Sequence, residues 1–238
     1  MKQFTMLLIS FIFLIGGAWA SDTTKVNVQG KNKVKYFKLN IDNDRTVVLN
    51  GVVKESNIKA IKEQIKGFIV TDPLKPIFII INSPGGSVTA GFDIINFIKS
   101  SKIKTYCAIE TQAFSMAAIL AQYCTHTYVS KYAGIMFHQP SYQVDGSVSQ
   151  INARVNFMNN LTKALETDLA KQMGISYKEY KNNIKEEWWM TAVEAAKLGI
   201  VDGVLNELYY TAEPPKDRGF SIFGEDYSTG TLTKHPMR

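Results

Sequence analysis

Three short segments of the sequence carry residue types that together could perform acyl transfer. They are SPGGS at 83–87, TQAFSMAAI at 111–119, which contains Ser115, and GIMFH at 134–138, which ends in His138. A serine hydroxyl becomes a nucleophile when a base takes its proton, and neutral imidazole is suited to that near neutral pH. A Gly-Gly turn offers backbone N–H groups without side chains in the way, so it can stabilise an oxyanion. The combination indicates hydrolysis of an amide or an ester.

Each segment alone is weak support, because a serine at the start of a helix is usually a helix cap. One histidine among three is likewise more often structural than catalytic. Their position strengthens the case for a catalytic role, since each segment follows or ends a predicted strand. These strands are expected at 76–82, 104–110 and 134–140. In an open parallel sheet, ligands bind at the carboxyl ends of the strands. We therefore expect Ser115 and His138 to meet at this edge.

The rest of the chain alternates predicted strands with predicted helices, which predicts an α/β fold with a mainly parallel sheet. The run PIFIIIN is continuously apolar, which is typical of a strand buried on both faces of such a sheet. Strands are expected at 45–53, 76–82, 104–110, 125–129 and 134–140. Helices are expected at 58–68, 89–100, 113–124, 148–173, 177–187 and 191–198, the last capped by Thr191 and Glu194.

The helix expected at 148–173 is longer than the globular mean. Its apolar residues step by three or four from Val148 to Met173, and Gly174 ends the pattern. A helix of this length usually extends beyond its own domain and packs on something else. The alternative is a surface helix that lies on its own sheet.

The ends of the chain differ from its middle. Lys2, the apolar run Met6–Ile15 and Ala18-Trp19-Ala20 match a secretory signal peptide over 1–20, which is too short for a comfortable membrane span. We expect export to the periplasm or the exterior and a soluble mature chain beginning near Ser21. Residues 21–44 are polar and rich in lysine and are interpreted as a loose arm, 45–211 as the catalytic domain, and 212–238 as an irregular tail.

Charge and cysteine content narrow the choice of partners. The formal net charge is +6, but the lysines are scattered, so nucleic-acid binding has little support. The sequence contains no HExxH and no paired CxxC motif, and we expect neither a metal nor a cofactor. A strand that contains Cys107 and a returning helix that ends at Cys124 would bring both thiols to one end of the unit. In an oxidising compartment they either form a disulfide or remain two buried free thiols.

The segments INSPGGSVTAG, QAFSMAA and MFHQP, in that order, resemble the proteolytic subunit of Clp protease, the ClpP family. The resemblance covers roughly 45–206 and implies the ClpP/crotonase fold. It implies Ser115 as nucleophile, His138 as general base, and Gly86 and Met116 as donors of the oxyanion-hole N–H groups. It also implies that the long helix is a handle through which two heptameric rings of identical subunits stack around a closed chamber. The implied substrates are peptides or unfolded proteins.

The sequence departs from the family at three positions near the implied site. The third residue of the family's triad, an aspartate, falls on Asn183, which could orient His138 through its carbonyl oxygen but carries no charge. Glu186 and Glu187 are close enough in sequence to substitute for it. Thr111 replaces a family glycine, and Phe114 stands where the family has a small residue, so Phe114 could narrow the cleft or cover the serine.

Export is a further departure, because the family works with ATP-driven unfoldases of the cytoplasm. An exported compartment has no ATP supply, so we expect no unfoldase partner. Three other interpretations remain open. They are a catalytically weak or inactive ClpP-like ring or scaffold, an acyl-CoA enzyme of the crotonase type, and a Ser–Lys peptidase that uses Lys131.

Overall fold

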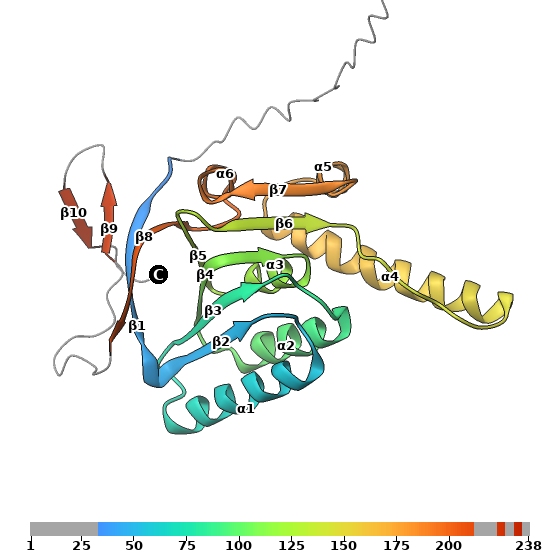
Figure 1. Ribbon diagram of the computed structural model, residues 1–238, viewed down its shortest axis with the longest axis horizontal. Helices are drawn as coiled ribbons and strands as arrows, with labels where there is room; N and C mark the ends of the chain where they lie inside the picture. The colour runs from blue at the N-terminus through green and yellow to red at the C-terminus, as the bar shows by residue number, and fades with distance from the viewer. Residues whose placement is uncertain (1–32, 212–222, 227–230, 235–238) are drawn as a thin grey trace, which may run out of the picture.

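One mainly parallel sheet organises the chain in the computed structural model, which describes residues 33–211, 223–226 and 231–234 (Figure 1). Its strands are β1 (Tyr36–Asp42), β2 (Thr46–Asn50), β3 (Ile77–Ser83), β4 (Thr105–Phe114), β5 (His126–Ser130), β6 (Gly134–His138), β7 (Glu187–Thr191), β8 (Gly203–Thr211), β9 (Phe223–Asp226) and β10 (Thr231–Lys234). The helices are α1 (Glu55–Thr71), α2 (Val88–Ser101), α3 (Met116–Ala121), α4 (Val148–Gln172), α5 (Tyr177–Asn183) and α6 (Ala192–Leu198).

Within these residues the strand order is β10-β9-β1-β8-β5-β4-β3-β2, and β6 pairs with both β4 and β7. The pairs that surround β4 are all parallel, whereas β6–β7, β1–β9 and β9–β10 are antiparallel. The predicted α/β fold with a mainly parallel sheet is confirmed.

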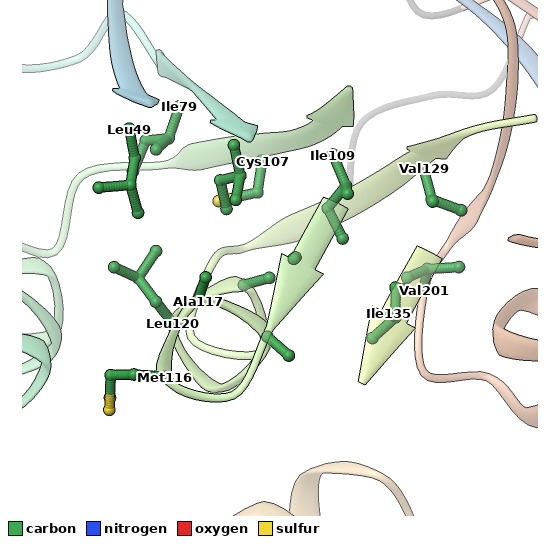
Figure 2. Close-up of a cluster of buried hydrophobic side chains, with 14 of the residues drawn as sticks. Leu49, Ile79, Cys107, Ile109, Met116, Ala117, Leu120, Val129, Ile135 and Val201 are labelled. Carbon is green, nitrogen blue, oxygen red and sulfur yellow. The ribbon is translucent and has the colours of Figure 1, made fainter. Parts of the chain in front are cut away.

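Strand β3 is buried on both faces of the sheet, which explains why its sequence is continuously apolar. Ile77, Ile79 and Ile81 point into one core, and Phe78 and Ile80 point into a second core on the other face of the sheet. Figure 2 shows the first core, where strand residues such as Ile79 and Ile109 face Met116, Ala117 and Leu120 of α3. Full burial of one such aliphatic side chain stabilises the fold by about 1.5–3 kcal/mol, so α3 is held by packing despite its length. The core therefore fixes the position of the short helix that begins beside Ser115.

The long helix α4 agrees with its predicted bounds and extends away from the sheet (Figure 1). Ser147 and Gln150 form a capping box at its start. Near its end Leu169 and Ala170 are buried, whereas the apolar residues Val148 and Phe157 at its start are exposed. The end of α4 thus belongs to the core, and its start leaves apolar surface uncovered in the single chain.

Three strands correct the expectations for the chain ends. The interpretation of 21–44 as a loose arm is wrong for its last part, because 36–42 form β1, which pairs with β8. Phe37, Leu39 and Ile41 alternate with less buried residues there, a period of two that the many lysines obscured. Residues 223–226 and 231–234 of the supposed irregular tail are also strands. The expected signal peptide over 1–20 and the start of the expected arm, 21–32, lie outside the described residues.

The segment after α4 also differs from expectation. The helix expected at 177–187 ends at Asn183, and residues 187–191 form β7 along β6. Trp188 packs against Phe137 and Tyr180, which favours an extended strand at this point. None of the helices in the described part of the chain combines the length and hydrophobicity that crossing a bilayer requires.

Candidate active site

Ser115 occupies a sharp turn between β4 and α3 rather than the interior of a helix. Strand β4 continues to Phe114, four residues beyond its predicted end, and α3 begins only at Met116. Ser115 has φ 54° and ψ −124°, a region that costs a non-glycine residue about 1–3 kcal/mol. The turn is held by a bond from its N–H to the carbonyl of Met136, at 2.8 Å. A strained strand-to-helix turn of this kind exposes the serine Oγ at the edge of the sheet.

The hydroxyl of Ser115 is not a helix cap, because it makes no capping bond to α3. Its partner is His138 at the end of β6, with 2.7 Å between Oγ and Nε2. When Nδ1 carries the ring proton, the hydroxyl donates to Nε2, which is the geometry of a nucleophile and its general base. Both side chains are only partly buried, so a substrate can reach them. The structure therefore brings together the two residues that the sequence placed at this edge.

The Gly-Gly turn lies directly against the serine. A Cβ on Gly85, whose φ is +91°, would be 2.7 Å from Ser115 Cβ and 3.0 Å from Met116 N, so this approach requires glycine. Gly86 lines the same cavity as Ser115 and Met116. Among the described residues, no hydrogen bond engages the backbone N–H of Gly86 or that of Met116. Free N–H groups beside a nucleophile are what an oxyanion hole requires.

A cavity of about 90 Å³ adjoins Ser115 and His138. Its walls come from α2, α3, the segment after β6, α4 and α5, and they expose more apolar than polar surface. The lining residues are Gly86, Val88, Ser115, Met116, Ile119, His138, Pro140, Ser141, Tyr142, Thr162, Leu165, Glu166, Leu169 and Tyr180. This volume is less than that of an apolar cavity that holds benzene, about 150 Å³, so the cavity suits one side chain of moderate size.

Two residues of this cavity could not be singled out from the sequence. Glu166 is 3% exposed, receives a bond from Lys181 Nζ at 2.9 Å and accepts one from the Tyr177 hydroxyl at 3.2 Å. Burial and the carboxylate of Glu166 raise the pKa of Tyr180, so the phenol stays neutral. Glu166 directly follows Leu165 of the apolar stripe, and nothing in the sequence marks its burial or its partners on α5.

Asn183 is the predicted site residue that the structure does not bring into contact with the pair. It ends α5 and lines a different surface cavity, together with Lys185, Glu186 and Trp188. Within residues 33–211, no hydrogen bond joins Asn183 to His138, and none engages Nδ1 of His138. The role of Asn183 therefore stays a prediction.

Glu187 is the carboxylate that pairs with His138 across the β6–β7 ladder. It is the register partner of His138 in the antiparallel β6–β7 pair, where opposite side chains share a face. Its Oε2 accepts a bond from Trp189 Nε1 at 2.8 Å, so its carboxylate is engaged elsewhere. For Glu187 to act beside His138 in place of the family's triad aspartate, its bond to Trp189 would have to break.

Phe114 does not cover the serine. Its ring packs edge-on against Trp189, with 4.9 Å between centroids, and lies beside Gly134. Neither Phe114 nor the exposed Thr111 lines the cavity at Ser115. The two departures from the family pattern near Ser115 thus lie outside the wall of its cavity.

The remaining candidate residues are also placed by the structure. Cys107 and Cys124 form a disulfide, with 5.9 Å between their Cα atoms. Lys131 lies over the ring of Tyr132 and does not line the cavity, so the Ser–Lys alternative has no support. In the described part of the chain, no group of three or more His, Cys, Asp or Glu residues could hold a metal ion.

Comparison with known proteins identifies the family that this chain matches. The family model described as Clp protease matches residues 29–208. The chain is 30% identical over 167 residues to "ATP-dependent Clp protease proteolytic subunit 1" of Borreliella burgdorferi, covering 68% of this chain and 84% of that protein. It is 31% identical over 167 residues to "ATP-dependent Clp protease proteolytic subunit" of Borrelia garinii subsp. bavariensis, with the same coverage. The chain belongs to the Clp protease family.

Proposed function

We propose that this protein is a serine endopeptidase that hydrolyses peptides or unfolded polypeptides through an acyl-enzyme on Ser115. The observation that carries the proposal is the 2.7 Å separation of Ser115 Oγ and His138 Nε2 at the edge of a cavity. The family relatives, which are named proteolytic subunits, support the same reaction class. The proposal assigns a role to each residue of the site.

The reaction follows from the positions of these atoms. His138 Nε2 takes the proton of the Ser115 hydroxyl while Oγ attacks the carbonyl carbon of the scissile bond. The N–H groups of Gly86 and Met116 donate to the oxyanion, and His138 returns the proton to the departing amine as the C–N bond breaks. Water then attacks the acyl-enzyme with His138 again as base, which releases the second product and restores Ser115.

Asn183 is the third group of this proposal, as an orienting residue for His138. Asn183 ends α5 (Tyr177–Asn183) and lines a different cavity from His138, so this role requires the end of α5 to move toward Nδ1. We expect Asn183→Asp to raise kcat at least about tenfold, since a carboxylate stabilises the imidazolium as well as orienting the ring. Hydrolysis of an unstructured fluorogenic peptide measures the change.

The neighbouring Asn182→Asp variant is the control for the Asn183 prediction. It adds the same charge one residue earlier, at an exposed position of α5. If both variants change kcat equally, the change comes from the added negative charge alone. The proposed role of Asn183 in orienting His138 is then wrong. A large loss in Glu187→Gln would instead assign that role to Glu187.

We further propose that the active form is a homo-oligomer. The start of α4 leaves Val148, Val155 and Phe157 exposed in the single chain, although they are apolar. Uncovered apolar residues on a protruding helix favour packing against a second copy. The resemblance implies heptameric rings with the active sites in a closed chamber.

Export is proposed from the features of residues 1–20. Its support within the described residues is the Cys107–Cys124 disulfide, because such bonds persist in oxidising compartments. Export separates this protein from ATP, so we propose that it works without an unfoldase. Substrates would then be limited to chains that are already unfolded or short.

Active-site labelling of the protein purified from its own cells tests the proposal. A fluorophosphonate should modify Ser115 alone, and the same sample should hydrolyse an unstructured peptide. The intact mass should correspond to a chain that begins near Ser21, and the mass in solution should be that of an oligomer. An assembled oligomer that neither reacts nor cleaves peptides would contradict the proposed activity.

One observation favours a second candidate, a catalytically inactive ring or scaffold. His138 has no partner at Nδ1 among the described residues, so its tautomer is not fixed there. The two candidates differ in vivo, since a scaffold keeps its full cellular function after Ser115→Ala and a peptidase does not.

A further inference from the structure

The disulfide spans the segment that carries the nucleophile. Cys107 lies within β4, Cys124 lies after α3, and the bond joins residues 17 positions apart with Ser115 near the middle. The enclosed segment holds the end of β4, the turn at Ser115 and the whole of α3. The bond therefore connects the two elements whose junction is the proposed active-site turn.

This turn depends on its surroundings to keep its shape. Ser115 holds a backbone conformation that costs about 1–3 kcal/mol, and such residues persist only when neighbouring structure over-determines them. Helix α3 (Met116–Ala121) is too short to be stable alone, so its place on β4 is set by tertiary contacts. Covalent attachment of the segment after α3 to β4 is one of these contacts.

Hydrogen bonds at the same end of the unit supplement the disulfide. Thr105 N–H donates to Thr125 Oγ1 and Thr125 N–H donates to Thr105 Oγ1, both at 3.0 Å. The hydroxyl of Thr127 donates to the carbonyl of Ala121 at 2.6 Å. These bonds and the buried face of α3 remain when the disulfide opens, so the fold should survive its loss while α3 gains freedom.

We infer that the Cys107–Cys124 disulfide is a positioning device for Ser115 that makes the proposed peptidase activity dependent on redox state. The inference rests on the proposed function. Helix α3 begins with Met116, so a shift of α3 on β4 moves both the Ser115 turn and the Met116 N–H relative to His138. A misplacement of about 1 Å can slow an enzyme about 100-fold.

The two sulfurs differ in their exposure to solvent, which determines which of them a reductant attacks. Cys107 is 0% exposed, whereas Cys124 is half-buried and lines a surface cavity of about 290 Å³ with Gln122 and Gln172. A dithiol reductant attacks Cys124 with one thiolate, the bond to Cys107 breaks, and Cys107 leaves and takes a proton. The second thiol of the reductant then displaces Cys124, so the two cysteines gain two electrons and two protons that the dithiol loses.

Labelling kinetics of the full assembled protein test the inference. The rate of fluorophosphonate labelling at Ser115 is measured for oxidised protein, for protein reduced with dithiothreitol until two thiols are counted, and for protein reoxidised afterwards. We expect reduction to lower the rate 10- to 100-fold and reoxidation to restore it. For peptide hydrolysis we expect kcat to fall with little change in KM. The Cys107→Ala/Cys124→Ala variant should show the low rate with or without dithiothreitol.

Circular dichroism and amide hydrogen exchange complete the test. The inference expects intact secondary structure after reduction, with faster exchange confined to the segment from Ser115 to Ala121. An unchanged labelling rate in fully reduced protein would overturn it, and so would global unfolding, which would make the bond a general stabiliser. If the oxidised protein does not react at all, the proposed function has failed, and hydrogen exchange still decides whether the disulfide fixes the turn.

Discussion

Ser115→Ala should lower kcat/KM for an unstructured peptide by about 10⁴-fold or more and abolish fluorophosphonate labelling. The variant keeps the cavity and the N–H groups of Gly86 and Met116, so it retains only the catalysis that binding and oxyanion stabilisation provide. A loss of 10⁴-fold corresponds to about 5 kcal/mol of transition-state stabilisation. Steady-state kinetics with active-site titration of the wild type measure the difference.

Ser115→Gly separates the chemical loss from an effect on folding. Glycine adopts φ 54° without the penalty that alanine and serine incur. We therefore expect this variant to be as inactive as Ser115→Ala but more stable, by about 1–2 kcal/mol in its free energy of unfolding. Ser100→Ala, at an exposed position of α2, is the control for serine removal and should leave kcat/KM unchanged. Activity retained in both Ser115 variants would rule out Ser115 as the nucleophile.

The fold was predictable wherever burial produced a recognisable pattern of apolar residues in the sequence. The continuous apolar run of β3 and the stepped apolar residues of α4 each reflect one packing environment along the whole element, so their types and positions were predicted. β1 was missed because its half-buried positions include lysine and asparagine and its fully buried positions are only three. β7 was missed because its two adjacent tryptophans lie on opposite faces of the strand. The sequence there does not alternate between apolar and polar residues.

The site was predictable to the extent that sheet topology determines it. The edge at which Ser115 and His138 meet follows from the direction of parallel strands, and the structure places the two side chains 2.7 Å apart. Residues that depend on loops or on a second helix were not predictable. Glu166 and Tyr180 reach the cavity through the packing of α5 on α4, and the direction in which Phe114 points depends on β7.

His138→Ala should reduce kcat about 10⁴-fold or more and leave KM for the peptide nearly unchanged. Without imidazole, nothing in the described part of the cavity wall is placed within hydrogen-bond distance of Ser115 Oγ to take its proton. Added imidazole should restore part of the activity, because the variant leaves an open space of the same shape beside Ser115. His126→Ala is the matched control, since His126 lies beside Asp202 and does not line the cavity.

The strongest consequence of the Ser115–His138 geometry is that the two losses should not add. If the residues act as one unit, proton transfer and attack fail together, and Ser115→Ala/His138→Ala should be no less active than either single variant. Independent roles would instead multiply the two effects and place the double variant several orders of magnitude lower. A multiplied loss would therefore show that the hydrogen bond between Oγ and Nε2 is not the basis of the activity, even if each single variant is inactive.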